Sequence, residues 1–299
     1  MELQEHFIGL TLVPAALLGV IANWLVVFAT WQSGSLTHSF SLLTANQAVF
    51  NACHSTVCLF YIAPMVVLNS EVMIAYSDRA GFVLLISYDA SRIALFLITI
   101  NRFIAVFYPI VYLKFFTATW TKRIILLSFS ISLSMVTYFY QFLPCRFSYR
   151  TEINAFNFTN FSICRPYVVY GVFFKLIVVS LFDVILDGIT VWKVRKIKER
   201  IRGGQPQVAA CEKKEIDCLK QSVAQSIFGF LFPLVTYTIP LLAHNNMVTF
   251  VCAVVLWCLL HSMDGVFTLC FNSTVREALK WKRRDSVLPV GQLVGSCDG

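Results

Sequence analysis

The sequence predicts an all-α integral membrane protein that folds as a bundle of seven transmembrane helices. Of its 299 residues, 58% are apolar and 13% are charged, whereas soluble domains are about 45–50% apolar and about 25% charged. No Asp, Glu, Lys or Arg occurs between His6 and Ser70, or between Gln221 and Met263. Each of these stretches can hold two helical spans of about 20 residues. This composition excludes a cytosolic enzyme, a disordered chain and a disulfide-dense secreted module.

The apolar segments predict seven spanning helices, and we take them in chain order. The first is longer than the apolar part of a signal peptide and follows two acids, Glu2 and Glu5, so we expect it to stay in the membrane. The predicted spans are 7–31, 39–62, 80–107, 123–143, 167–191, 219–243 and 247–271.

The chain beyond residue 271 is expected to leave the bundle, which occupies residues 1–271. Val275 and Leu279 lie one helical turn apart among basic residues, which predicts a short amphipathic helix over 272–284 on the membrane surface. The tail over 285–299 contains Gly, Ser and Pro with little charge and is predicted to be disordered.

The basic residues predict the orientation of the bundle. If the N-terminus is outside, 18 Lys and Arg lie on the cytosolic side and 4 on the outer side, as the positive-inside rule requires. Two glycosylation sequons agree, because both fall in the 144–166 loop, which is then extracellular. They begin at Asn157 and Asn160, and we expect glycans there. The net charge of +8 thus reflects topology and not binding to nucleic acid.

Two of the ten cysteines, Cys145 and Cys164, lie in the same outer loop. The other eight fall in spans or on the cytosolic side, where thiols stay reduced. A bridge between Cys145 and Cys164 would close a loop of about 20 residues and stabilise the fold by roughly 3 kcal/mol. We predict this disulfide; the alternative is two free thiols near the membrane surface.

The inner end of the third helix carries a motif. Residues 101–112 read Asn-Arg-Phe-Ile-Ala-Val-Phe-Tyr-Pro-Ile-Val-Tyr, and this segment resembles the Asp-Arg-Tyr segment of rhodopsin-like G-protein-coupled receptors. The residues that match at the usual spacing are Arg102, Ala105, Pro109 and Tyr112.

More narrowly, the chain resembles the nematode chemosensory receptors of serpentine class X over nearly its whole length. The segments that carry this resemblance are Ser39-Phe40, 101–112, the loop from Cys145 to Cys164, 221–225, 261–265 and Phe271-Asn272.

Three departures from the rhodopsin-like pattern change what is expected. Asn101 replaces the acid that normally precedes Arg102. No cysteine lies near the outer end of the third helix, so the usual bridge to the outer loop cannot form. The seventh helix contains no Lys, which excludes a retinal Schiff base.

The resemblance implies a receptor in the plasma membrane, in sensory cilia of neurons for a chemosensory role, that couples an extracellular ligand to a heterotrimeric G protein. A neuropeptide or hormone receptor is the alternative. An odorant-gated channel of inverted topology disagrees with the charge bias. No catalytic residue, cofactor or metal is expected. The residues that we assign to coupling and activation are Asn101, Arg102, Ala105, Pro109, Tyr112, Asp187 and Asp264.

Ionisable residues within spans are expensive in lipid and mark candidate sites. At 1.5 Å of rise per residue, matching depths pair Asp89 with Lys175 and Arg102 with Asp187 across the third and fifth helices. The same depths pair Arg92 with Asp183, and Asp264 of the seventh helix competes with Asp183 for Arg92. If the Arg102–Asp187 contact breaks on activation, it is a switch; otherwise these pairs only fix helix packing.

The outermost of these groups predict a ligand pocket, because they lie at the depth of a buried cavity between helices. The residues that we expect to line it are Asp89, Arg92, Lys175, Tyr88, Tyr170 and Phe174.

Overall fold

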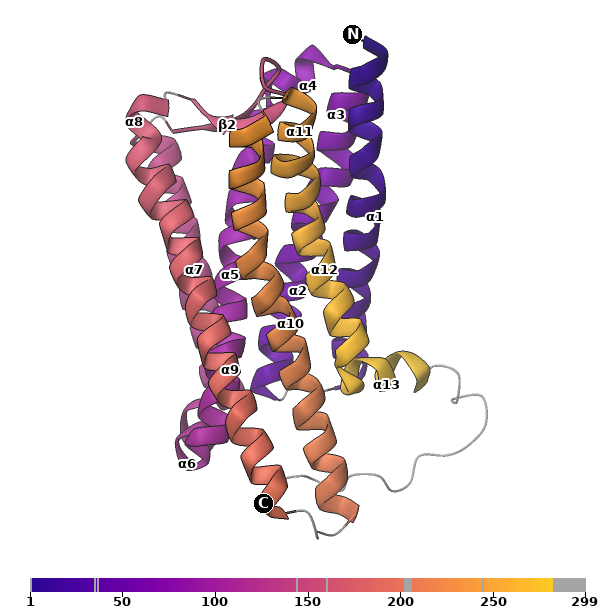
Figure 1. Ribbon diagram of the computed structural model, residues 1–299, viewed down its shortest axis with the longest axis vertical. Helices are drawn as coiled ribbons and strands as arrows, with labels where there is room; N and C mark the ends of the chain where they lie inside the picture. Colours follow the sequence, from indigo (N-terminus) through magenta and orange to yellow (C-terminus); the bar gives the residue numbers. More distant parts are fainter. Residues whose placement is uncertain are drawn as a thin grey trace.

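The computed structural model describes residues 2–34, 36, 38–143, 145–159, 161–201, 206–243 and 245–281. Within these residues seven helices are long and apolar enough to cross a membrane, which confirms the predicted bundle (Figure 1). They cover Gly9–Gln32, Ser39–Val67, Ser77–Phe107, Ala118–Gln141, Ser162–Ile197, Ile216–Thr236 and Met247–Phe271.

Four of the spans are formed by single helices. These are α1 (Glu2–Gln32), α5 (Ser77–Phe107), α7 (Ala118–Gln141) and α10 (Pro206–Ala243). Short helices α4 (Glu71–Ala75) and α6 (Pro109–Phe115) lie in the connections on either side of α5.

The second, fifth and seventh spans each contain a π-helical segment, η2, η3 and η4. A π turn contains an extra residue and rotates the side chains beyond it, and no periodicity in the sequence had indicated one. The elements are α2 (Ser39–Val57), η2 (Cys58–Ile62) and α3 (Ala63–Val67); α8 (Phe161–Pro166), η3 (Tyr167–Phe174) and α9 (Lys175–Ile201); and α11 (Asn246–Phe250), η4 (Val251–Val255) and α12 (Leu256–Phe271).

The ends of the spans differ from the predicted ones by a few residues. The fourth begins at Ala118 and not at 123, because charged residues at the edge of the bilayer do not stop a helix. Thr117 caps it, accepting a hydrogen bond from the backbone N–H of Trp120 at 3.4 Å. The second continues to Val67, with Pro64 inside the continuous helix next to the π-helical segment η2; local π adjustments allow proline in spanning helices.

A β-hairpin covers the end of the bundle that carries the N-terminus, which we call the outer end in line with the predicted topology (Figure 1). Strands β1 (Phe147–Arg150) and β2 (Ala155–Phe158) pair antiparallel, with Phe147 opposite Phe158. No pattern identified in the sequence predicts this hairpin. Its turn contains Asn154 at φ +49°, a conformation that Asn tolerates better than most residues.

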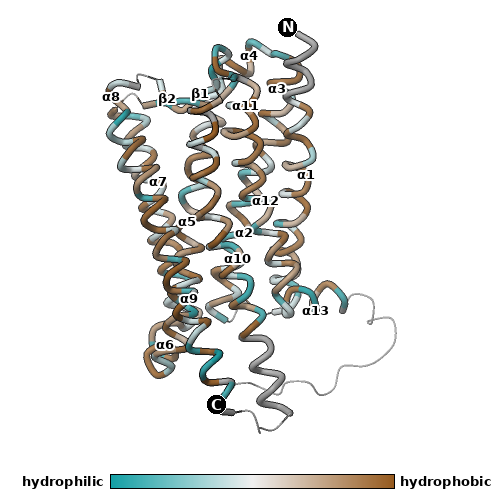
Figure 2. Tube along the Cα trace, viewed as in Figure 1, coloured by the Kyte–Doolittle hydropathy of each residue, from teal (hydrophilic) through white to brown (hydrophobic). Residues whose placement is uncertain are grey.

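Helix α5 occupies the centre of the bundle. It packs against α2, α7, α9 and α10, and it is the most buried of the seven spans. Figure 2 shows apolar residues along most of the length of the spans, with polar residues concentrated near the ends and at scattered positions inside. The polar positions on α5 therefore lie where several helices can reach them.

At the inner end, helix α13 (Ser273–Trp281) follows the last span and turns away from the bundle axis (Figure 1). Its apolar side holds Val275 and Ala278, which are buried against Val26 and Ala29 of α1. Residues 285–299, for which we predict disorder, lie outside the described residues.

Candidate functional site

A cavity of about 170 Å³ lies beneath the hairpin at the outer end of the bundle. Its walls come from α5, both strands, η3, α9, α10, η4 and α12, and they are mostly apolar. We call this cavity the outer chamber. Its aromatic lining residues are Tyr88, Phe147, Phe156, Phe158, Phe232 and Trp257.

The hairpin is held over the chamber by close contacts with α5 and α7. A Cβ on Gly81 would overlap the backbone carbonyl oxygen of Phe147, so only glycine allows β1 to approach α5 so closely. The backbone N–H of Tyr149 donates to Ser77 Oγ at 3.0 Å, and that of Phe147 donates to Tyr140 Oη at 3.0 Å.

The predicted disulfide between Cys145 and Cys164 is present. It joins the start of the hairpin segment to α8 at the top of the fifth span, and both cysteines are buried. The bridge therefore connects the β-hairpin, which forms the roof of the chamber, to the span that forms one of its walls.

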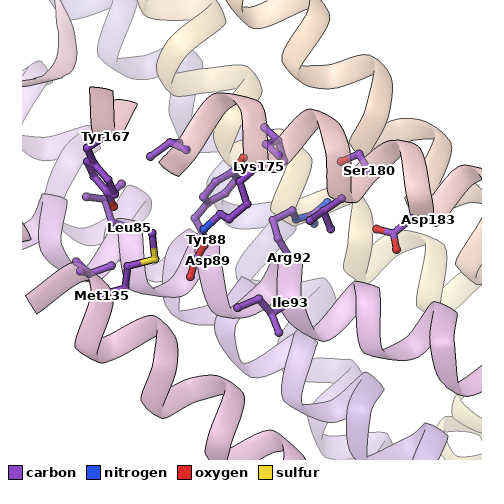
Figure 3. Close-up of a pocket in the computed structure, with 14 residues that line it drawn as sticks. Leu85, Tyr88, Asp89, Arg92, Ile93, Met135, Tyr167, Lys175, Ser180 and Asp183 are labelled. Atoms are coloured by element: carbon purple, nitrogen blue, oxygen red, sulfur yellow. Dashed lines mark hydrogen bonds and ion pairs between the residues drawn. The ribbon is translucent and has the colours of Figure 1, made fainter. Parts of the chain in front are cut away.

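A narrow crevice of about 40 Å³ lies next to the outer chamber, between α5, α7, η3 and α9, and Figure 3 shows residues that line it. Leu85, Tyr88, Val172 and Leu176 line both spaces, so the two lie side by side and share these residues as a common wall. Unlike the chamber, the crevice has charged walls. Its ionisable residues are Asp89 and Arg92 from α5 and Lys175 and Asp183 from α9.

Asp89 and Lys175 form an ion pair across the crevice, as the depth argument predicted. The carboxylate is largely buried, whereas the Lys175 side chain is 37% exposed. The amine is therefore only partly enclosed by protein.

Arg92 forms its ion pair with Asp264 of α12, so the pairing with Asp183 expected from depth is wrong and the competing residue is the partner. Its guanidinium passes close to α10, because a Cβ on Gly229 would lie 2.8 Å from Nη1. The absence of a side chain at residue 229 thus leaves room for Arg92 to cross the bundle.

Asp264 is the centre of a buried polar network. Besides Arg92 it accepts hydrogen bonds from Asn51 Nδ2 at 3.3 Å and Gln47 Nε2 at 3.4 Å, both on α2. Gln225 of α10 donates to the Asp264 backbone carbonyl at 2.9 Å. The network thus joins α2, α5, α10 and α12 through one residue.

The chamber is connected to this network through stacked rings. Trp257 and Tyr88 both line the chamber and pack edge to face at 5.5 Å. Trp257 contacts His54 at 4.7 Å, and His54 stacks on His261 at 3.9 Å between ring centroids. His261 Nδ1 lies 2.6 Å from Asn51 Oδ1, and Asn51 in turn donates a hydrogen bond to Asp264.

The inner end of α5 is tied to its neighbours through Asn101. Its Nδ2 donates to Ser39 Oγ at 3.0 Å, and Ser39 Oγ lies 2.9 Å from the hydroxyl of Tyr112 on α6. The Arg102 guanidinium lies over the ring of Phe40, 3.6 Å from its centroid. Asn101 is therefore an amide donor that links α2, α5 and α6.

The Asp187 carboxylate is bound by two serine hydroxyls of α10, where the depth argument had assigned it to Arg102. Ser222 Oγ donates at 2.9 Å and Ser226 Oγ at 2.7 Å. Depth alone could not distinguish α5 from α10, since both helices reach this level of the bundle.

Two of the residues expected in the pocket lie elsewhere. Tyr170 and Phe174 are 70% and 58% exposed on the outside of the bundle and line neither the chamber nor the crevice. Both lie in η3. A π-helical segment rotates its side chains relative to a regular α-helix, and here both face the outside of the bundle. Composition cannot separate lipid-facing from cavity-facing aromatics, because both environments favour them.

The remaining predicted positions are distributed over both ends. Ala105 lies in the last turns of α5, and Pro109 is the first residue of α6. Asn157 lies in β2, and Asn160 lies outside the described residues. Among the residues that the structure describes, no group of three or more His, Cys, Asp or Glu is arranged to hold a metal ion.

The sequence reasoning missed the aromatic roof and the two stacked histidines. His54 and His261 lie in different spans, and a charge-free apolar segment gave no reason to place them in contact. Trp257 and His261 lie one turn apart on the same helix, and this spacing is the local pattern from which their contact with a common neighbour could be predicted. It gives no indication of His54.

Comparison with known proteins gives three consistent results. Residues 13–272 match the family described as "Serpentine type 7TM GPCR chemoreceptor Srx". Serpentine receptor class X 45 of Caenorhabditis elegans is 25% identical over 300 residues, covering 92% of this chain and 81% of that protein. The crystal structure of squid rhodopsin superimposes with a TM-score of 0.72 at 13% identity, covering 97% of this chain and 89% of that one.

Proposed function

The chain belongs to the Srx family of serpentine seven-transmembrane G-protein-coupled chemoreceptors, and from this premise we propose how it binds its ligand and signals. It is a multi-pass membrane protein and a chemosensory receptor. Membership of a chemoreceptor family favours this role over that of a neuropeptide or hormone receptor, and the rhodopsin fold argues against an odorant-gated channel.

We propose that the outer chamber and its crevice are the ligand site. The observation that carries this proposal is the unbroken series of contacts from Trp257 in the chamber wall to Asp264 in the polar core. We take the receptor to have a resting and an active state that differ in the position of the Trp257 side chain. A ligand that binds one of these states more tightly shifts the equilibrium toward it. Distance alone would not connect the two sites, but contacts between packed side chains do.

The inner end is where we place the G protein. Movement of the Asp264 network changes the hydrogen bond from Gln225 and hence the position of α10, next to α5 and α9. Arg102, at the inner end of α5, then contacts the G protein, while Asn101, Ala105, Pro109 and Tyr112 hold α5 and α6 in position. Asp187, bound to Ser222 and Ser226, holds α9 against α10 in the resting arrangement.

The surroundings complete the proposal. The receptor resides in the plasma membrane, in sensory cilia where the cell has them, with a glycan on the 144–166 loop. Helix α13 lies on the inner leaflet, with its buried side against α1 and its basic side toward lipid headgroups.

The test is nucleotide exchange on purified heterotrimeric G proteins with the receptor in lipid nanodiscs. The wild-type receptor is expected to accelerate exchange of GDP for GTP on at least one class of Gα subunit, and Arg102→Ala to reduce that acceleration about tenfold. Lys114→Ala, on α6, serves as a control for loss of a basic residue on the same face. Failure of every Gα class, or equal rates for Arg102→Ala and wild type, contradicts G-protein coupling through this end.

A further inference from the structure

The charged crevice below the outer chamber contains a carboxylate, Asp183, whose charge the surrounding cations do not balance. Two cations face the crevice, Lys175 and Arg92. Lys175 is in an ion pair with Asp89, and Arg92 is in an ion pair with Asp264. Arg92 is near enough to Asp183 to act on it electrostatically, but its charge is already shared.

Asp183 is also incompletely hydrogen-bonded. Its side chain is buried, at 2% exposed, and its Oδ1 has no hydrogen-bond partner among the described residues. The hydroxyl of Ser180, one turn above on α9, is directed to the backbone carbonyl of Gly229 at 3.4 Å. Thr99 of α5 hydrogen-bonds the carboxyl group, but a buried carboxylate that is only partly hydrogen-bonded and shares its nearest cation is still unfavourable in the membrane interior. A positively charged group from outside the chain would therefore stabilise it.

The space beside Asp183 fits a small head group. A cavity needs about 10–15 Å³ to hold a water molecule, and the crevice has about 40 Å³. An ammonium group, which is close to water in size, fits there, whereas an aromatic ring does not. The apolar remainder of such a molecule would occupy the outer chamber, whose walls carry no charged side chain.

We propose that the ligand of this receptor is an amine, protonated at neutral pH and attached to an apolar body, and that Asp183 is its counter-ion. This inference rests on the proposal that chamber and crevice form the ligand site. The rings of Phe156, Phe158 and Trp257 surround the apolar body, and the ammonium group reaches into the crevice and donates hydrogen bonds to Asp183.

Arg92 offers the main competing chemistry. Its Nε and Nη1 have no hydrogen-bond partner among the described residues, and a carboxylate could accept from them. We favour the cation because an added anion would raise the excess of negative charge made by Asp89, Asp183 and Asp264, whereas an ammonium group removes it.

The test compares three probes of nearly equal size and different head group, namely 2-phenylethylamine, 2-phenylethanol and phenylacetate. Binding is measured as the rise in melting temperature of the full-length receptor in nanodiscs, without a G protein. We expect the amine to stabilise the wild-type receptor at about tenfold lower concentration than the alcohol, as for a hydrogen bond to a buried charged group, and phenylacetate to give no shift.

Asp183→Asn is the decisive variant. It removes the charge at nearly constant shape, and we expect the amine and the alcohol then to bind equally. Asp78→Asn, which removes a carboxylate of α5 paired with Arg146 at the outer surface, is the matched control and keeps the preference. The melting temperature of unliganded Asp183→Asn, expected to equal or exceed that of wild type, verifies that this variant folds.

Each other result overturns the proposal. Preference for phenylacetate would make Arg92 the anchor. Equal binding of amine and alcohol, or no shift with the amine, would mean that the crevice holds only water. Because no G protein is present, these failures are separate from failure of the exchange assay, which alone decides coupling.

Discussion

The polar residues inside this bundle act through pairing more than through their individual chemistry. Arg92 and Asp264 are both almost fully buried, and each would be expensive in the membrane interior without the other. Asn51 contributes in two ways, because its Nδ2 donates to Asp264 while its Oδ1 meets Ser91 Oγ and His261 Nδ1, both at 2.6 Å. One amide thus connects the ion pair to the stacked histidines.

At this scale we predict strong coupling between Arg92 and Asp264. Asp264→Asn leaves a buried guanidinium without its counter-ion and should lower the free energy of unfolding by about 3 kcal/mol. Arg92→Gln should cost a similar amount for the opposite charge. The double variant, which buries no unpaired charge, should be more stable than either single one.

The measurement is the melting temperature of the four purified proteins in nanodiscs. Gln47→Leu, which removes a weaker 3.4 Å hydrogen bond to the same carboxylate, serves as a comparison and should have a smaller effect. Additive losses in the double variant would show that the two charges are stabilised separately.

The elements of the outer end act as a unit, because the hairpin, the disulfide and α5 hold one another in place. Phe147 packs against Phe156, Phe158 and Trp257, so the position of β1 determines the roof of the chamber. Gly81 is the point where this strand meets α5 most closely.

Replacing Gly81 with alanine should therefore displace the hairpin. The added Cβ overlaps a backbone oxygen that cannot rotate away, and overpacking of this kind costs about 1–3 kcal/mol. Gly188→Ala on α9 is the matched control, because its Cβ would meet nothing within 4 Å and alanine favours a helix by up to about 1 kcal/mol. Melting temperatures of the two variants should move in opposite directions; equal changes would disprove the close approach.

The inner elements are joined by a contact between α10 and α13. Asp217 of α10 forms an ion pair with Arg276 of α13, with 3.6 Å between Oδ2 and Nη2, and Asn272 Nδ2 donates to Gln221 Oε1 at 3.2 Å. These contacts hold the inner end of α10 against the segment that follows the seventh span. Movement of α10 away from the bundle has to break both.

We predict that loosening this contact raises basal signalling. Arg276→Gln removes a half-exposed ion pair worth up to about 1 kcal/mol and should increase basal nucleotide exchange about two- to fivefold. Lys280→Gln, on the same helix, removes an equal charge elsewhere and should change nothing. Unchanged basal exchange for Arg276→Gln, at equal receptor density, would exclude a restraining role.

On the scale of the whole molecule, the orientation in the bilayer connects the two functional ends. The outer chamber must open to the side from which the ligand comes, and the inner end must meet the G protein in the cytosol. The bias of 18 Lys and Arg against 4 predicts this orientation from the whole chain, independently of any one contact.

A glycosidase mobility shift tests the orientation. The wild-type receptor should shift, and the Asn157→Gln/Asn160→Gln variant should not. A new sequon built at residues 203–210 should remain unmodified, because that segment is predicted to be cytosolic. Modification of the new site would instead mean that the bundle is inverted, and the receptor mechanism would fail.

The sequence by itself was enough to predict the seven spans, the Cys145–Cys164 bridge, the Asp89–Lys175 pair and the receptor family. These follow from quantities that lie along the chain, namely hydropathy, the position of charges, depth counted from a helix end and motif spacing. Depth worked for Lys175 because only one acid on a neighbouring span lies at its level.

Only the tertiary structure decided the partner of Arg92, the serine ligands of Asp187, the exclusion of Tyr170 and Phe174 from the pocket, and the aromatic roof. Each depends on how a helix is rotated about its axis, and a π turn such as η3 changes that rotation through one extra residue. A depth calculation contains no rotation, so it cannot choose among several helices that reach the same level. The candidate ligand site is therefore defined by how the helices pack, which the depth of each residue along its helix does not determine.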